Sequence, residues 1–417
     1  MRTLSALVLV CLLCSGIAQG KADGSREGPN PRAILMREPA RTAGALVSLR
    51  DVKENSGSVP LRFFITDMGT LGGSESFAHA LNDRGQAVGV SRVAGDLDTH
   101  KFLYFGGRMS DLFPLDSEHI QTGHPTDIND SGVIASGVIS SGIYLPATMD
   151  TRNGTITVLP CLGGLTSLGF SGTATAINAS GHVAGYCYVD GLNRRAIIYR
   201  DGFTTDLGSF GGDSAAIDIN DHGVATGFAS DAVSGTATAF VYNGTMTPLF
   251  GNGTESYGRA INNWGHVVGE HLTPNGTFHG FLYKNGTVTD LGSSNSPDTV
   301  PFAINDDEQV VGTKVLTFAS TCSYGPCTVS KQFGFIWLDG QMALLDALVP
   351  KHLNWELSWA FDINNNGQVV GYGERNGQFH AFMMTPAINK EQCQNGAWKA
   401  FEFKSHGHCV AFVLTGD

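Results

Sequence analysis

The sequence predicts an all-β protein, a seven-bladed β-propeller, and three observations support this fold class. A turn of the type Asn-Asp-x-Gly recurs along the chain, and its first residue is always an asparagine: Asn82, Asn129, Asn178, Asn220, Asn262, Asn305 and Asn364. Successive copies lie about 42 to 59 residues apart, the length of a propeller blade of about four strands. The composition, with 42% apolar residues, 15% charged residues and 54 glycines, fits short strands joined by many turns.

The first twenty residues have the pattern of a secretory signal peptide. Arg2 provides the positive charge, Leu4 to Cys14 form an apolar run too short to span a bilayer, and small residues precede a cleavage site near Gly20. Residues 21–61 are rich in Gly, Pro, Ser, Arg and Glu without periodicity, which predicts a flexible leader or linker. We therefore expect a secreted, extracellular protein without a transmembrane segment. The formal net charge of −12 argues against nucleic acid as a partner.

Each repeat combines the asparagine turn with two further motifs. One resembles Asp-Leu-Gly, as at residues 206–208, and the other resembles His-Ala-Phe, as at residues 380–382. In the turn, the Asn bonds its own backbone and the closing Gly takes the left-handed conformation, which predicts a hairpin. Glu308 replaces that Gly in the sixth copy, so we expect this turn to be strained or differently shaped.

The order of the motifs predicts how the ring closes. The seventh copy stops after Phe382 without its Asp-Leu-Gly strand, whereas residues 63–69 supply such a strand before the first turn. We expect this N-terminal strand to complete the last blade and to remove an exposed sheet edge. The propeller is therefore predicted to span residues 62–386.

The strand before each turn carries a bulky residue next to the Asn and a small or acidic residue one position earlier. That earlier position holds Ala80, Asp127, Ala176, Asp218, Ala260, Ala303 and Asp362. Because side chains alternate between the two faces of a strand, this pattern predicts an innermost strand buried between neighbouring blades.

With these motifs in view, residues 62–385 resemble the bacterial extracellular HAF-type repeat family. The resemblance implies a secreted bacterial protein built as a propeller-like repeat array, and it offers no catalytic residues. Residues 387–417, with Cys393, Trp398 and the closing run Cys409 to Val413, resemble a short Cys-paired module that ends many secreted bacterial proteins.

Six cysteines follow the signal peptide, and an even number in a secreted chain favours disulfides. We predict a Cys393–Cys409 bridge in the small tail and a local Cys322–Cys327 bridge. Cys161 and Cys187 form a plausible third pair whose connectivity stays open. Zinc held by His406, His408 and the tail cysteines is the alternative that we disfavour.

Two other metal sites are considered and also disfavoured, so we predict no metal and no cofactor. Asp127, Asp218 and Asp362 stand where a calcium loop has its first ligand, but the late carboxylate that calcium requires is missing. Turn capping explains these residues better. The motif histidines His100, His279 and His380 lie on different blades, which is unsuited to one metal.

No sequence motif names a reaction, because G-x-S-x-G, H-E-x-x-H, G-x-x-x-x-G-K and G-x-G-x-x-G are all absent. The leading hypothesis is a non-enzymatic binding or scaffold module for an unidentified extracellular glycan, peptide or protein. Its contact surface is expected among variable turn residues and the long insertions of the sixth unit: Arg84, His222, Trp264, Tyr324 and Trp355.

The alternative is a propeller hydrolase or lyase that acts on extracellular polysaccharide through Asp127, Asp218 or Asp362. The surroundings of these carboxylates discriminate the two hypotheses. Carboxylates that face an open pocket favour the enzyme, and carboxylates bonded to backbone amides favour the binding module.

Overall fold

A computed structural model describes residues 61–112, 121–122, 125–140, 143–163, 171–189, 193–251, 253–292, 298–322 and 325–416. The predicted signal peptide and most of the predicted linker lie outside these residues, as does Tyr324. The chain divides into two units, one made of Met1–Leu46 and Ala319–Val329 and the other of Val47–Phe318 and Ser330–Asp417. The second unit contains the tail and the propeller strands except residues 319–322 and 325–329.

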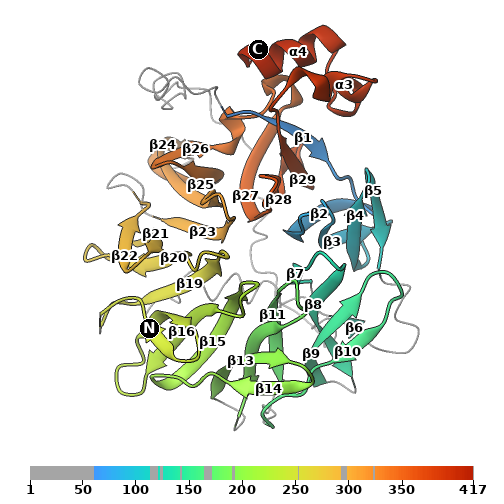
Figure 1. Cartoon of the computed structure of the whole chain (residues 1–417). Coiled ribbons are helices and arrows are strands. Elements are labelled where there is room, and N and C mark those ends of the chain that lie inside the picture. The colour runs from blue at the N-terminus through green and yellow to red at the C-terminus, as the bar shows by residue number, and fades with distance from the viewer. Residues whose placement is uncertain are drawn as a thin grey trace. The chain divides into compact units, whose positions relative to one another are not determined.

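Seven antiparallel sheets form the blades of a β-propeller, which confirms the predicted fold class (Figure 1). Each blade begins with its innermost strand, and consecutive strands pair outward. Blade one contains β2 (Gly72–Leu81), β3 (Ala87–Val93), β4 (Thr99–Phe105) and β5 (Arg108–Asp111). Blade two contains β6 (Gln121–Thr122), β7 (Asp127–Ile128), β8 (Val133–Ser140), β9 (Ile143–Asp150) and β10 (Ile156–Val158). Blade three contains β11 (Gly172–Ile177), β12 (Val183–Tyr188), β13 (Arg194–Arg200) and β14 (Phe203–Asp206).

The later blades follow the same plan, with two short 3-10 helices, η3 (Leu345–Ala347) and η4 (Lys351–Leu353), between blades six and seven. Blade four contains β15 (Gly211–Ile219), β16 (Ala225–Asp231), β17 (Ala237–Tyr242) and β18 (Met246–Pro248), and blade five contains β19 (Ser256–Ile261), β20 (Val267–Leu272), β21 (Phe278–Lys284) and β22 (Thr287–Asp290). Blade six contains β23 (Thr299–Ile304), β24 (Val310–Cys322), β25 (Gly325–Leu338) and β26 (Gln341–Leu344). Blade seven contains β27 (Trp355–Ile363), β28 (Val369–Arg375) and β29 (Gln378–Pro386).

The N-terminal strand completes the seventh blade, as predicted. Strand β1 (Phe63–Asp67) pairs antiparallel with β29, so that Phe63 lies opposite Pro386 and Asp67 opposite Phe382. The side chains of Phe63, Phe64 and Ile65 are no more than 2% exposed. The two ends of the propeller therefore share one hydrophobic sheet, and the outer edge of β29 is paired.

The seven turn asparagines also bind one another in a closed ring. The Nδ2 group of each donates to the backbone carbonyl of the Asn in the next blade at 2.9–3.1 Å, and Asn364 returns to Asn82. Each Oδ1 accepts the N–H four residues further on. The position requires a donor and an acceptor on one short side chain, which Asn provides and Asp does not.

Replacing Asn262 by Ala is expected to destabilise the propeller by about 2–4 kcal/mol. Asn262 is 3% exposed, and its loss leaves the N–H groups of Trp264 and His266 and the carbonyl of Asn305 without their partner. Urea unfolding measures the change. The exposed Asn275→Ala serves as the matched control and should unfold like the wild type; equal stability of both variants would contradict the role of the ring.

The sixth turn keeps the shape of the others at the expense of strain. Glu308, which stands in place of the turn Gly, adopts a left-handed φ of 59°, and its N–H donates to the carbonyl of Asn305 at 3.1 Å. The corresponding Gly265 has a φ of 77° and the same hydrogen bond to Asn262. Of the two expectations for this turn, strain is the one realised.

In six blades, the Gly seven residues after the turn Asn is required by a bulge in the innermost strand. In blade five the register of β19 shifts between Gly258 and Ala260, and a Cβ on Gly269 would lie 2.0 Å from the carbonyl oxygen of Tyr257. The same distance is 1.9–2.1 Å in five other blades, at Gly89, Gly185, Gly227, Gly312 and Gly371. Blade two has Ser136 there, and its innermost strand is interrupted between β6 and β7.

The C-terminal module is helical and covers the closing strand. It consists of η5 (Lys390–Cys393), α3 (Ala397–Ala400) and α4 (His406–Thr415), joined by the predicted Cys393–Cys409 disulfide. Phe64 of β1 stacks on Phe401 with ring centroids 4.1 Å apart and packs against Phe403 and Phe412. The tail therefore fixes the strand that closes the ring.

The other predicted disulfides are met as far as the described residues extend. Cys161, in the segment between β10 and β11, forms a disulfide with Cys187 of β12. Cys327 is disulfide-bonded as well, and the side chain of Cys322, its predicted partner, lies outside the described residues. Among the helices of the described residues, none is long and apolar enough to cross a membrane.

Candidate functional site

The seven turns surround a central opening of about 200 Å³ on one face of the propeller, which we call the turn face. Backbone and side chains of all seven asparagine turns line it. Its lining also contains the acidic residues Asp83, Asp127, Asp130, Asp218, Asp221, Asp306 and Asp362. The three inner-strand carboxylates that the enzyme hypothesis requires therefore face this opening.

Asp127, Asp218 and Asp362 are nevertheless engaged by the backbone. One oxygen of each carboxylate accepts the N–H of the next residue in its own strand, and the other accepts an N–H from the following blade. All six bonds measure 2.7–2.8 Å. The carboxylates therefore join neighbouring innermost strands.

The distribution of these acids follows from an odd number of blades. Each Asp carboxylate accepts the N–H of the residue before the turn Asn, both in its own blade and in the next blade. The next blade therefore needs no Asp of its own, and it has Ala at this position. Alternation fails once in a ring of seven, where Ala260 and Ala303 are consecutive. The amide left without a carboxylate is that of Ile304. This arrangement also avoids adjacent charges.

Burial raises the pKa of all three carboxyls, to about 7 for Asp218 and about 8 for Asp362. Repulsion from Asp127 adds to the rise at Asp218 and Asp362, and the hydrogen bonds from backbone amides act in the opposite direction. In water an Asp has a pKa near 3.8. Protons therefore remain on this cluster at pH values where exposed acids are ionised.

These pKa values predict that the propeller becomes less stable as the pH rises between about 4 and about 8. The folded chain binds more protons than the unfolded chain in this window, because the carboxyl pKa values are higher in the folded state. Asp362→Asn, which resembles the protonated acid, should make the fall in melting temperature between pH 6 and pH 8 shallower. An unchanged slope in differential scanning calorimetry would contradict this assignment.

The motif histidines bind the aspartates of the Asp-Leu-Gly motifs. The Nδ1 atoms of His100 and His279 lie 2.8 and 2.9 Å from carboxylate oxygens of Asp111 and Asp290, and His380 lies 3.0 Å from Asp67. The two motifs thus join neighbouring outer strands of a blade. Across the part of the chain that the structure describes, no group of three or more His, Cys, Asp or Glu side chains is placed to hold a metal ion.

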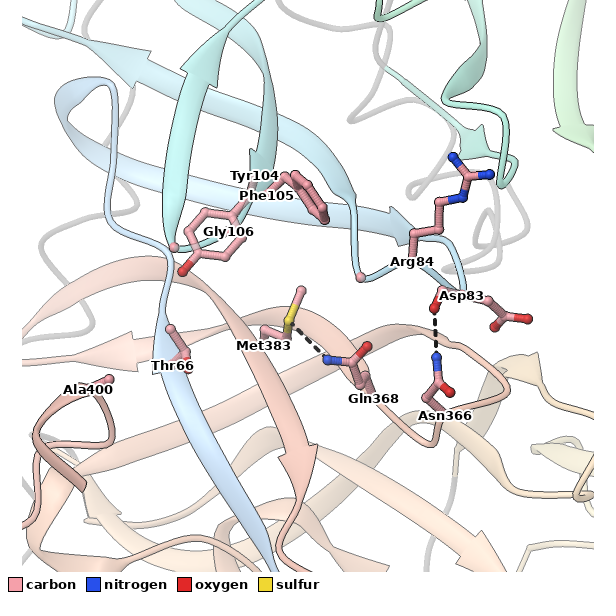
Figure 2. A pocket seen from close by; sticks show the side chains of 12 residues that line it. Thr66, Asp83, Arg84, Tyr104, Phe105, Gly106, Asn366, Gln368, Met383 and Ala400 are labelled. Carbon is pink, nitrogen blue, oxygen red and sulfur yellow. Dashed lines mark hydrogen bonds between the residues drawn. The ribbon is translucent and has the colours of Figure 1, made fainter. Parts of the chain in front are cut away.

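A second concavity, of about 480 Å³, lies where blades one and seven meet (Figure 2). We call it the junction pocket. Blade one contributes its asparagine turn, the end of β4 and the turn between β4 and β5. Blade seven contributes its asparagine turn and β29, and the closing strand and α3 add one residue each. Its lining is Thr66, Asp83, Arg84, Gly85, Tyr104, Phe105, Gly106, Gly107, Asn366, Gln368, Met383 and Ala400.

Several groups in the junction pocket have no bonding role within the described chain. Tyr104 is 6% exposed, yet its hydroxyl makes no hydrogen bond to a described residue. Figure 2 shows this hydroxyl pointing toward the side of the pocket where Thr66 lies. Phe105 is 53% exposed. Arg84 is exposed and has no partner among the described residues. These groups are therefore available for contacts with a ligand.

The junction pocket also differs from the other blades. The position of Phe105, three residues after the motif Phe, holds Asp150, Arg200, Asn243, Lys284, Leu338 and Thr385 elsewhere. Arg84 is likewise the one Lys or Arg at the variable turn position of the seven repeats. Two neighbouring turns of blade one therefore depart from the repeat at the same pocket.

Of the four predicted contact residues that the structure describes, Arg84 alone lines this pocket. His222 is exposed on the turn of blade four, and Trp264, 70% exposed on the turn of blade five, donates from Nε1 to the carbonyl of Asp306 at 2.9 Å. Trp355 was expected to contribute to an exposed contact surface, and the structure corrects this expectation. It is 8% exposed and packs in the core beside Phe382. The insertion before it folds into η3 and η4, which contribute buried residues to the same core.

Sequence reasoning missed Phe105 and Tyr104. Phe105 could have been found by comparing, in all seven repeats, the residue three positions after the Phe of the His-Ala-Phe motif. No other blade has an aromatic residue there. Tyr104 gives no such signal, because Tyr199, Tyr242 and Tyr283 occupy the same position in blades three to five.

No family model matches the chain, and no curated protein matches it either. The solved structures to which it is similar include the β-propeller domain of the Trilobed protease from Pyrococcus furiosus, at 10% identity and a TM-score of 0.48, covering 78% of this chain and 95% of that one. An oligogalacturonate lyase from Vibrio parahaemolyticus is similar at 8% identity and a TM-score of 0.47, covering 78% of this chain and 97% of that one. A putative TolB from Agrobacterium tumefaciens is similar at 12% identity and a TM-score of 0.39, covering 60% of this chain and 86% of that one. Such likenesses carry no argument about what this chain binds or does.

Proposed function

We propose that this chain is a secreted binding protein of the HAF-type repeat kind, without enzymatic activity, that holds an extracellular ligand in the junction pocket. The observation that carries the proposal is the contrast between the two concavities of the turn face. The inner-strand carboxylates of the central opening are engaged by backbone amides, whereas Arg84, Phe105 and the Tyr104 hydroxyl have no such role.

The engaged carboxylates weigh against the hydrolase or lyase alternative. A general acid or base must reach the reacting atoms of a substrate with a free oxygen. Both oxygens of Asp127, Asp218 and Asp362 already accept backbone N–H groups at 2.7–2.8 Å. Use of these acids in catalysis would require bonds between neighbouring blades to break.

Glycan and peptide arrays probed with the wild type, Phe105→Ala and Trp264→Ala test the proposal. We expect the wild type and Trp264→Ala to bind the same ligands and Phe105→Ala to lose them, because Phe105 lines the junction pocket and Trp264 does not. Incubation of the bound ligand with the wild type should release no product. Equal binding by Phe105→Ala, or turnover that Asp362→Asn abolishes, would contradict the proposed function.

A further inference from the structure

We propose that the junction pocket takes an acidic sugar, a pyranose ring that bears a carboxylate, at the end of an extracellular glycan. This inference rests on the proposed function, since it names the ligand of the same pocket. The volume of about 480 Å³ lies within the range of small-molecule sites, roughly 300–1,000 Å³. Three properties of the lining select the ligand class.

The first property is a guanidinium that forms no ion pair with a described residue. Arg84 is the one Lys or Arg in the lining, and it stands on an asparagine turn at the edge of the pocket (Figure 2). The neighbouring Asp83 carries the opposite charge, but its carboxylate accepts the backbone N–H and the Nδ2 group of Asn365 at 2.7 and 3.1 Å and forms no ion pair with Arg84. A guanidinium presents paired N–H donors that match the two oxygens of a carboxylate.

The second property is an uncovered aromatic surface. Phe105 ends β4 and is followed by Gly106 and Gly107, whose φ values of 60° and 80° make the tight turn and which have no side chains to cover the ring. A large apolar side chain left 53% exposed gains free energy when a ligand covers it. One face of a pyranose ring carries mainly C–H groups and is flat enough to lie on such a ring.

The third property is a set of polar groups suited to hydroxyls. The hydroxyls of Tyr104 and Thr66 make no hydrogen bond to a described residue. The Nδ2 group of Asn366 donates to the carbonyl of Asp83 at 2.6 Å, and the side-chain oxygen of Asn366 accepts no hydrogen bond from a described residue. A peptide that ends in an aromatic residue could use Arg84 and Phe105, but it would leave these hydroxyls unpaired, which costs affinity.

Isothermal titration calorimetry with three probes tests the inference. The probes are a disaccharide that ends in a hexuronic acid, the same disaccharide with a neutral hexose at that end, and a tetrapeptide that ends in phenylalanine with a free carboxylate. We expect the wild type to bind the acidic disaccharide at least about tenfold more tightly than the neutral one, as the loss of a charged hydrogen-bonding pair implies. The peptide should bind more weakly than both.

Variants separate the charge from the aromatic surface. Arg84→Ala should reduce the preference for the acidic disaccharide to about one, and Phe105→Ala should weaken both sugars. Arg200→Ala removes the same charge from the exposed end of β13 in blade three, outside the pocket, and should bind like the wild type. A preference that survives in Arg84→Ala, or equal binding of both sugars by the wild type, would overturn the inference.

The outcomes also distinguish this inference from the proposed function. Tighter binding of the peptide, or no binding of any probe, overturns the acidic-sugar assignment. The proposed function survives that result if ligands found on the arrays still require Phe105. If array ligands bind without Phe105, both statements fail together.

Discussion

A chain that begins at residue 71 is expected to lose the cooperative unfolding transition of the whole propeller. The deletion removes β1, and with it Phe63, Phe64 and Ile65, which are no more than 2% exposed. Burial of each such side chain contributes about 1.5–3 kcal/mol, so the three together approach the net stability of a typical domain, about 5–15 kcal/mol. The deletion also exposes the edge of β29 and uncovers the core of the C-terminal module.

Circular dichroism and calorimetry of two truncated chains measure this effect. The matched control begins at residue 61 and keeps β1, so it should melt as the mature full chain does. The chain that begins at residue 71 should show no native transition. Melting of that shorter chain at the native temperature would contradict closure by β1.

Gly269→Ala is expected to destabilise the protein by about 3 kcal/mol or more. The added Cβ would lie 2.0 Å from the carbonyl oxygen of Tyr257 and 2.9 Å from the ring of Phe281, which is fully buried. Neither neighbour can move freely, because the carbonyl belongs to the bulged innermost strand and the ring to the blade core. The bulge itself would have to change.

Chemical denaturation compares this variant with Gly251→Ala. Gly251 is exposed, and a Cβ there would meet no atom within 4 Å, so the control should change stability by less than about 0.5 kcal/mol. Equal effects of the two substitutions would show that the close approach in the innermost strand is not what selects Gly269.

Local chemistry made the blades predictable, and contacts between blades did not follow from it. The turn role of Asn262 could be read from the sequence, because its side-chain oxygen bonds N–H groups within four residues. Its donation to the carbonyl of Asn305 in the next blade could not. The same holds for Asp218, whose link to the amide of Ile261 crosses between blades.

The candidate site was only partly predictable for a related reason. Arg84 was visible as a departure from the repeat, but the pocket beside it requires Thr66 from the start of the propeller and Ala400 from the tail. Long insertions misled in the case of Trp355, because η3 and η4 fold over the core instead of forming an exposed loop. The helices of the tail were not anticipated, although its disulfide was.

The central claim is that the repeated residues hold the ring together and that ligand binding belongs to the departures around the junction pocket. Thermal unfolding and acidic-disaccharide affinity, measured side by side on Asn262→Ala and Phe105→Ala, test it most directly. We predict that Asn262→Ala melts at a lower temperature with an unchanged Kd, and that Phe105→Ala melts like the wild type with a weakened Kd. The reverse pattern, in which Asn262→Ala alters binding alone or Phe105→Ala alters stability alone, would contradict the claim.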